Sequence, residues 1–329
     1  MNYTVINDIL TISECKWRQF VSEHPKSCYF HSHNYYKSLM KSRGHEPLSV
    51  MVINNSNVIG LAIGEISNEV RWLPHITKRT ILYAEPIYTN VEVLNLLLAE
   101  ITKNTKGLFC QIRPFYNLTD DELKVYSKYG FIRKGHYNSF IPVRSPELLF
   151  KSFGKDKRKG VKKARNKYNL KIVEYNDKRK SVDLFYSMMA ELYYKKRHAI
   201  KSKDYFMKLA SESNGDVRIV CAVYDTLPIA SQLYMISGNR LTAYYTATLP
   251  NHKDKHAGDL LIWYLLNVCY RRKIPTFDFG GGGAVGKQYQ PRDYKKRFGT
   301  QFQDVGRFTY HKSILYTPLN YFYKKMLKN

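Results

Sequence analysis

Residues 241–283, LTAYYTATLPNHKDKHAGDLLIWYLLNVCYRRKIPTFDFGGGG, carry the clearest structural pattern in the chain. The run Leu241–Leu249 predicts a strand, and the polar stretch Asn251–His256 predicts a loop. Gly258–Arg272 has the apolar spacing of a helix and ends in basic side chains, which suit the negative end of the helix dipole. Thr276–Phe279 is a short apolar strand that enters a run of glycines. The segment therefore predicts a strand–loop–helix–strand unit.

Strands and helices alternate on both sides of this unit. In the second half, strands are expected at Leu170–Tyr175, Val217–Tyr224 and Pro228–Ile236, and helices at Val182–Arg197 and Lys203–Glu212. In the first half, helices are expected at 12–23, 34–42 and 91–104, and strands at 48–54, 58–66, 80–83 and 107–114. The run NNSN between two of these strands (Asn54–Asn57) predicts a hairpin turn.

A chain of 329 residues is long for one domain and sufficient for two. Interleaved helices and strands predict an α/β fold in which each half has a mixed sheet flanked by helices. The expected domains are 1–144 and 145–313. The C-terminal segment 314–329, with a helix at Ile314–Leu327, is expected to pack on the first domain.

The charge of the chain is strongly positive. Fifty-three Lys and Arg against 27 Asp and Glu give a formal net charge of +26. Such a field attracts phosphate-rich partners, namely RNA, anionic lipid or nucleotide-linked substrates, although a lysine-rich genome would also produce it. Nine basic residues and one acid, Asp156, cluster between Lys151 and Lys167. This basic segment is either a phosphate-binding surface or a solvated helix face.

Other features of the sequence exclude several classes. No run approaches the roughly 20 apolar residues of a membrane-spanning helix, and the N-terminus lacks the pattern of a secretory signal. The five cysteines are far apart, without metal-binding spacing, which fits a reducing cytoplasm. We therefore expect a soluble cytoplasmic protein without a metal site.

Two motifs close the second half. They are Phe277-Asp278-Phe279-Gly280-Gly281 and Tyr294-Lys295-Lys296-Arg297-Phe298-Gly299. An Asp-Phe-Gly-Gly strand end followed by an aromatic-Lys-x-x-Phe-Gly motif resembles the Fem family of peptidoglycan bridge aminoacyltransferases. The basic segment KRKGVKKARNK and the stretches PIASQLYM and AYYTAT support the resemblance. It covers residues 146–310 well and the first half only loosely.

The resemblance implies a fold and an activity. The fold is a pair of tandem GNAT acyltransferase-like domains, in which the strand–loop–helix–strand unit holds the donor and its loop amides and helix N-terminus receive phosphate oxygens. Fem enzymes move an amino acid from aminoacyl-tRNA to an amine of a peptidoglycan precursor. The alternative is an acyl-CoA-dependent N-acyltransferase acting on an amino sugar in capsule or lipopolysaccharide assembly. A non-enzymatic RNA or membrane binder would not need the two motifs.

The implied partners follow from this activity. They are tRNA and a cell-envelope precursor, with peripheral contact to an anionic membrane at its inner face and a monomeric enzyme. Aminoacyl-tRNA or acyl-CoA is a co-substrate, and no cofactor is bound permanently.

The resemblance also implies roles for single residues. Lys295 occupies the position of the motif lysine, where an ammonium can stabilise an oxyanion or bind a tRNA phosphate, and Tyr294 replaces the usual Phe beside it. Both are the candidate catalytic residues. The candidate substrate-binding residues are Tyr245, Lys195, Arg197 and Lys37.

The candidate donor-binding residues are basic or lie in the predicted loop. They are Lys255, Gly258, Arg158 and Lys162. Of the usual donor-loop pattern, only Gly258 is retained. Two departures affect the acceptor: Arg113 stands where an acid precedes the strand-ending proline in the family, and Lys195 is the best match to an acceptor-binding arginine. A point charge there replaces a bidentate fork.

Overall fold

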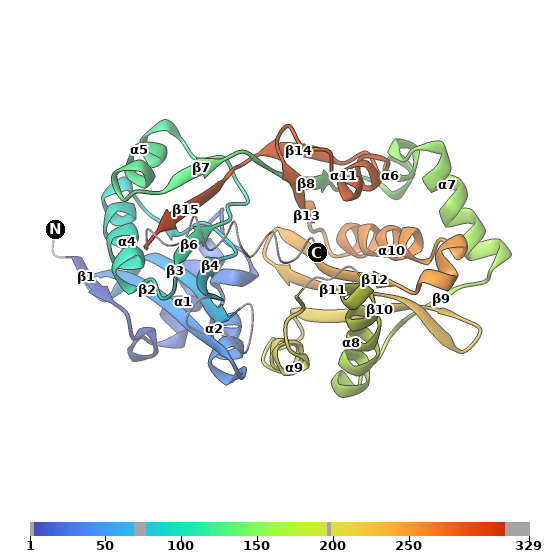
Figure 1. The fold of residues 1–329 in the computed structure, drawn as a ribbon, viewed down its shortest axis with the longest axis horizontal. Coiled ribbons are helices and arrows are strands. Elements are labelled where there is room, and N and C mark those ends of the chain that lie inside the picture. The colour runs from blue at the N-terminus through green and yellow to red at the C-terminus, as the bar shows by residue number, and fades with distance from the viewer. Residues whose placement is uncertain (1–2, 69–76, 196–198, 313–329) are drawn as a thin grey trace. The chain divides into compact units, whose positions relative to one another are not determined.

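The computed structural model describes residues 3–68, 77–195 and 199–312. The chain divides into two compact units (Figure 1). One unit runs to His136 and resumes at Asp304, and the other is Tyr137–Gln303. The expected helix at Ile314–Leu327 lies outside the described residues.

The first unit is built on a mixed sheet. Its elements are β1 (Tyr3–Ile6), η1 (Ile9–Thr11), α1 (Glu14–Glu23), η2 (Tyr29–His31), α2 (His33–Lys41), β2 (His45–Asn54), β3 (Asn57–Asn68), β4 (Lys78–Leu82), β5 (Ile87–Tyr88), α4 (Val91–Asn104), β6 (Phe109–Ile112), α5 (Asp120–Lys128), β7 (Ile132–Lys134) and β15 (Arg307–His311). Within the described residues the strand order is β1-β2-β3-β4-β6-β15-β7, and β5 pairs with β3. The β4–β6 pair is parallel, whereas β2 and β3 are antiparallel.

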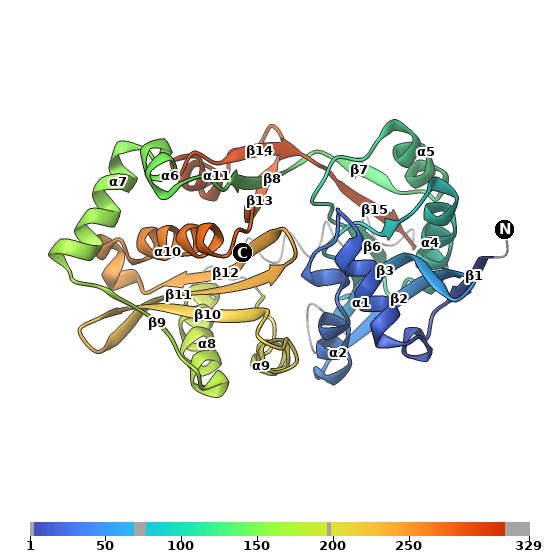
Figure 2. The same cartoon turned by 180° about the vertical axis from the view of Figure 1, so that it is seen from behind.

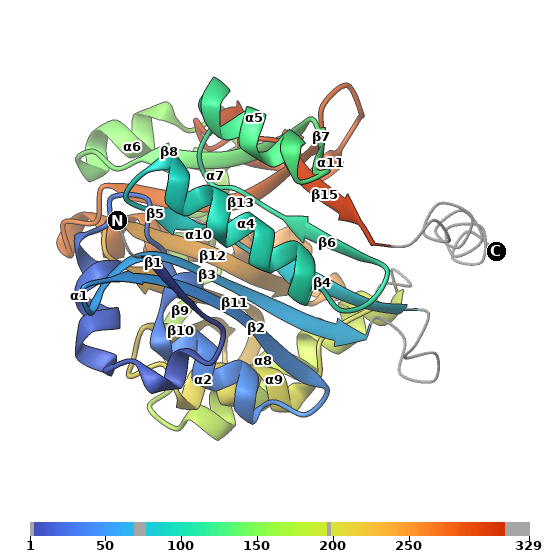
Figure 3. The same ribbon diagram turned by 90° about the vertical axis from the view of Figure 1, so that its left-hand side faces the viewer.

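Helices cover both faces of this sheet (Figure 3). α4 packs on β2 and β3 from one face, and α1 and α2 lie on the other. Val50, Leu97 and Ile112 are fully buried between sheet and helix. The predicted hairpin at Asn54–Asn57 is confirmed. Its two central residues, Asn55 and Ser56, have φ of 46° and 65°, the left-handed geometry of a tight hairpin turn.

The second unit is also a mixed sheet flanked by helices. Its elements are β8 (His136–Pro142), α6 (Pro146–Ser152), α7 (Lys155–Lys162), η3 (Lys163–Lys167), β9 (Lys171–Glu174), α8 (Lys178–Lys195), α9 (Lys203–Ser211), β10 (Val217–Tyr224), β11 (Leu227–Ser237), β12 (Arg240–Thr248), η4 (Pro250–Lys255), α10 (Ala257–Arg271), β13 (Thr276–Ala284), α11 (Gln290–Lys296) and β14 (Gln301–Asp304). In the described chain the strand order is β14-β8-β13-β12-β11-β10-β9.

The helices of the second unit lie on both faces of its sheet. α8 and α9 pack on one face, and α10 packs on the other (Figures 1 and 2). Leu241, Leu265 and Phe277 are fully buried between α10 and the strands. Burying each such side chain contributes about 1.5–3 kcal/mol. The predicted α/β class, with a mixed sheet in each half, is confirmed.

Two strands belong to the sheet of the other half of the sequence. β8 precedes residue 145 but belongs to the second sheet, while β15 returns to the first sheet and pairs with β6 and β7. Sequence periodicity predicts strands but not their neighbours, because pairing joins segments that are distant along the chain.

Several elements were not predicted from the sequence. α5, η3 and α11 are short or polar and have too few apolar residues for a clear helical period. The side chain of Ser145 caps α6 by accepting a hydrogen bond from the amide of Leu148 at 3.4 Å. No helix of the described residues is long and apolar enough to cross a membrane.

Candidate active site

β12 and β13 separate partway along their length. They pair in parallel only where Arg240–Thr242 faces Thr276–Asp278, although both strands continue well beyond this point. Gly280 turns β13 with a φ of +73°, which glycine adopts without strain. On the other side, the register of β11 with β12 shifts next to Tyr244, as in a β-bulge. A split between two parallel strands results.

A buried acid fixes the strand at this split. Asp278 is fully buried and accepts hydrogen bonds from the Gly280 amide at 2.6 Å and the Asn138 amide nitrogen at 3.0 Å. The guanidinium of Arg240 also binds its carboxylate. These bonds make Asp278 a buried structural acid, and they set the direction in which β13 leaves the sheet.

Lys295 reaches this split from α11. Its Nζ donates to the carbonyl oxygens of Phe279 at 2.5 Å and Gly281 at 2.8 Å, and to Oγ of Ser139 at 3.3 Å. An ammonium has three donors, so all three are engaged. Burial lowers the pKa of Lys295 to about 8. A positive charge is therefore fixed beside the open edge of β13.

The rate of transfer should depend on the protonation of Lys295. Because its pKa lies near 8 instead of the ordinary 10.5, the ammonium is present below pH 8 and is lost as the pH rises through 8. An attacking amine gains reactivity as it loses its own proton with rising pH. A bell-shaped profile of kcat/KM that falls above about pH 8 is expected. Lys296→Ala should keep this alkaline limb, and a limb beginning only near pH 10 would contradict the assignment.

A second cluster surrounds the first turn of α10. Oδ1 of Asp259 accepts from Nζ of Lys157 at 2.9 Å and from the hydroxyl of Tyr294 at 2.9 Å, and Oδ2 lies 3.2 Å from Nδ1 of His256. Lys157 also lies over the Tyr294 ring, 4.1 Å from its centroid. Burial and the neighbouring Asp259 raise the pKa of Tyr294 well above its usual value.

α7 approaches this turn closely because Gly160 has no side chain. A Cβ at Gly160 would lie 2.7 Å from Oδ2 of Asp259 and 2.8 Å from Nδ1 of His256. The N-terminal turn of α10 is thus packed by α7 on one side and by Tyr294 of α11 on another. Neighbouring residues Tyr294 and Lys295 fasten α11 to α10 and β13 respectively.

Tyr245 belongs to an aromatic cluster on the other side of β12. Its ring lies 5.1 Å from Phe206 of α9, 4.5 Å from Tyr244 and 6.2 Å from Tyr193 of α8, measured between centroids. Burial raises the pKa of Tyr193. Tyr245 is partly exposed in this cluster.

The other candidate substrate-binding residues pair with acids outside this cluster or lie outside the described chain. Lys195 is the last residue of α8, is exposed, and pairs with Glu191 at 2.7 Å one turn earlier. Lys37 lies on α2 of the first unit and pairs with Glu14 at 3.3 Å. Arg197 lies outside the described residues. Their roles as acceptor ligands stay predictions.

The candidate donor-binding residues have different surroundings. Arg158 donates to the carbonyl oxygens of Lys151 at 3.0 Å and Phe153 at 2.5 Å, and so caps the C-terminal end of α6. Lys255 lies over the ring of Tyr224, 4.9 Å from its centroid. Gly258 is in the first turn of α10; a Cβ there would lie 3.6 Å from the Tyr294 hydroxyl.

The remaining candidate, Lys162, lines a separate cavity described below. The structure therefore places Tyr294 next to Gly258 at the start of α10, places Lys295 next to β13, and leaves Lys162 at a separate cavity.

Three residues of this region were not singled out from the sequence. They are Ser139, Lys157 and Asp259. Asp259 follows the loop glycine directly, so its place in the first helical turn was available as a signal. Lys157 looks like its basic neighbours, and only its buried partner distinguishes it.

The sequence and fold were compared with known proteins. Residues 151–296 match the family described as Acetyltransferase (GNAT) domain. No curated protein matches the sequence. The fold is similar to that of FemX, with 17% identity, a TM-score of 0.73 and coverage of 98% of this chain and 99% of FemX.

Two further structures share the fold. One is the C-terminal domain of a protein assigned as a lysylphosphatidylglycerol synthetase from Agrobacterium fabrum, with 10% identity, a TM-score of 0.60 and coverage of 95% of this chain and 96% of that one. The other is a tandem GNAT protein from the clavulanic acid biosynthesis pathway, with 10% identity, a TM-score of 0.57 and coverage of 95% and 99%. At these low sequence identities, structural similarity establishes the fold alone.

The match over residues 151–296 and the split between β12 and β13 identify a GNAT-type acyltransferase domain in the second unit, and the chain as a whole shares a tandem fold with known acyltransferase structures. The resemblance to the Fem family, drawn from two motifs of the second half, is confirmed in the fold, because FemX matches nearly the whole chain.

Proposed function

We propose that this acyltransferase moves an aminoacyl group from aminoacyl-tRNA to an amine of a peptidoglycan-type cell-envelope precursor. The observation that carries the choice of donor is the packed first turn of α10. In the GNAT fold, this turn and the loop before it receive the pyrophosphate of an acyl-CoA. Here the same turn presents the buried carboxylate of Asp259, which is bound by Lys157 and Tyr294.

The packing of α7 also disfavours a pyrophosphate at the first turn of α10. Gly160 is so close to Asp259 and His256 that not even a methyl group fits between them. A pyrophosphate entering here would have to displace α7 and would meet a carboxylate. An aminoacyl-tRNA has no pyrophosphate to place at this turn, because its activated ester is attached to a ribose.

The chemistry needs no covalent intermediate with the protein. A neutral amine attacks the ester carbonyl, its nitrogen forms the new amide bond, and negative charge develops on the carbonyl oxygen. The ester bond to the ribose oxygen then breaks, and the proton lost by the amine ends on that leaving oxygen. Lys295 supplies a fixed positive charge near the split at which the carbonyl would lie. Such preorganised charge stabilises the transition state more than the ground state.

The donor can be tested directly. The purified chain, a mixture of labelled aminoacyl-tRNAs and a nucleotide-linked muramyl peptide should yield labelled peptide, and ribonuclease treatment of the donor should abolish this product. Calorimetry should detect no binding of acetyl-CoA, because the first turn of α10 is occupied. Ribonuclease-resistant transfer from acyl-CoA would instead establish the N-acyltransferase alternative and overturn this proposal.

A further inference from the structure

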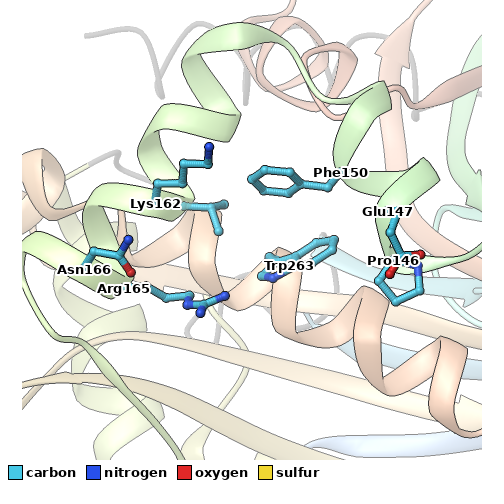
Figure 4. A pocket seen from close by; sticks show the side chains of 8 residues that line it. Pro146, Glu147, Phe150, Lys162, Arg165, Asn166 and Trp263 are labelled. Atoms are coloured by element: carbon cyan, nitrogen blue, oxygen red, sulfur yellow. The ribbon is translucent and has the colours of Figure 1, made fainter.

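The second unit contains a cavity away from the split. It lies between α6, α7 with η3, and α10, and has a volume of about 430 Å³ (Figure 4). This is within the range of about 300–1,000 Å³ that is usual for pockets that bind small molecules. α6 and α10 contribute aromatic and apolar side chains and the carboxylate of Glu147, whereas α7 and η3 contribute Val161 and cationic or amide side chains.

The aromatic part of the cavity is formed by Trp263 and Phe150. Their rings contact each other at 5.1 Å between centroids, and Trp263 also packs edge-on against Phe153 at 5.8 Å. Both Trp263 and Phe150 are only partly buried, and each faces the cavity (Figure 4). Rigid, partly exposed aromatic faces are the surfaces on which single-stranded nucleic acids stack their bases.

The cationic part is formed by Lys162 and Arg165. Both are exposed, and neither has a hydrogen-bonding or ionic partner among the residues that the structure describes. Two other cations of the basic segment are engaged, because Lys157 binds Asp259 and Arg158 binds backbone carbonyls of α6. Lys162 and Arg165, by contrast, remain available for a phosphate at the cavity, and Arg can bind a phosphate through two parallel hydrogen bonds.

The backbone places these groups beside the cavity through a π-helical turn. The amide of Tyr168 donates to the carbonyl of Lys163, five residues earlier, at 3.0 Å. Such wide turns occur frequently at functional sites. The turn also brings the amide side chain of Asn166 to the cavity, opposite the carboxylate of Glu147. An amide and a carboxylate can bind the polar edge of a base or a ribose hydroxyl.

We infer that this cavity binds one nucleotide of the single-stranded acceptor end of an RNA, with the base against Trp263 and Phe150 and the phosphate on Lys162 and Arg165. The inference rests on the proposed function, because it places the RNA part of the aminoacyl-tRNA donor. Trp263 is six residues beyond Ala257, which is about 9 Å along α10. This length of helix separates the cavity from the first turn of α10.

Binding of a labelled single-stranded RNA ending in CCA, measured by fluorescence anisotropy, tests the inference. In Lys162→Gln/Arg165→Gln, both cations that hold the phosphate are lost, so the slope of log Kd against log salt concentration should fall by about 0.7. Trp263→Leu should weaken binding about tenfold or more through lost stacking. Both charge changes are at exposed positions, so this variant keeps the test valid if Trp263→Leu does not fold.

Matched controls lie on the same helices. Lys159→Gln removes an exposed charge of α7, and Tyr270→Leu removes an exposed aromatic ring of α10, both outside the cavity. They should bind RNA like the wild type. Equal losses in control and cavity variants, or unchanged binding in the cavity variants, would overturn the inference.

Two further measurements distinguish a failure of the cavity assignment from a failure of the proposed function. If CoA binds the wild type and loses affinity in the cavity variants, the cavity belongs to CoA and the RNA assignment fails. If the wild type transfers amino acids from aminoacyl-tRNA while the cavity variants keep the same KM for it, only the cavity assignment fails. Absence of any aminoacyl-tRNA-dependent transfer would instead remove the proposed function.

Discussion

Lys295→Ala is expected to lower the turnover of the acyltransferase by about 10²–10³, an effect of the size seen when one group that stabilises an oxyanion is removed. The ammonium lies beside the split between β12 and β13 and holds the carbonyls of Phe279 and Gly281. Its removal takes away both a fixed charge and the bonds that shape the end of β13. The apparent affinity for the donor should change less than kcat. Steady-state and single-turnover kinetics with aminoacyl-tRNA measure the two effects separately.

The adjacent lysine provides the matched control. Lys296 is the next residue of α11, is exposed and has the same charge. Lys296→Ala should therefore keep nearly all of its turnover. Lys295→Met, which retains much of the side-chain volume, distinguishes loss of charge from loss of packing and should be as inactive as Lys295→Ala. Small and equal effects at Lys295 and Lys296 would show that the motif forms only a basic surface.

Asp259→Ala is expected to reduce the free energy of unfolding by about 3–5 kcal/mol, because it leaves the buried ammonium of Lys157 without its counter-charge. The side chains of Lys157 and Asp259 are only 10% and 6% exposed, and their atoms are 2.9 Å apart. The variant also deprives the Tyr294 hydroxyl of its acceptor. Urea unfolding followed by circular dichroism measures the loss.

A double variant and a surface pair complete this experiment. Lys157→Met/Asp259→Leu replaces both charges with apolar groups and should be much more stable than Asp259→Ala alone, since no buried charge remains unpaired. Asp121→Ala breaks the exposed pair with Lys124 and should leave the unfolding midpoint unchanged. A midpoint of Asp259→Ala equal to that of the wild type would mean that the cluster at α10 does not hold this turn in place.

Local patterns in the sequence predicted most of the regular structure. β10 was expected at Val217–Tyr224 and has these bounds. α10 was expected at Gly258–Arg272 and spans Ala257–Arg271. Apolar periodicity and turn residues act over a few positions, so a single sequence contains them. The glycine-rich exit of β13 was also visible, although the strand continues to Ala284 instead of ending at Phe279.

The basic segment shows what local sequence patterns do not predict. Its nine cations are equivalent in the sequence, yet in the structure they have different environments. Lys157 is buried in an ion pair, Arg158 caps a helix, and Lys162 faces a cavity without a partner among the described residues. The distinction depends on α10 and α6, which pack against this segment from other parts of the chain.

The sequence by itself determined the class of fold, the strand–loop–helix–strand unit and the position of Lys295 in a motif. Tertiary structure alone decided what that lysine contacts. Successive residues of a helix point about 100° apart, so Lys295 turns inward and Lys296 outward although both are lysines. The Ser139 hydroxyl that Lys295 binds is 156 residues away. Only folding brings such groups together, because hydrogen bonds and burial depend on distance in space and not on order along the chain.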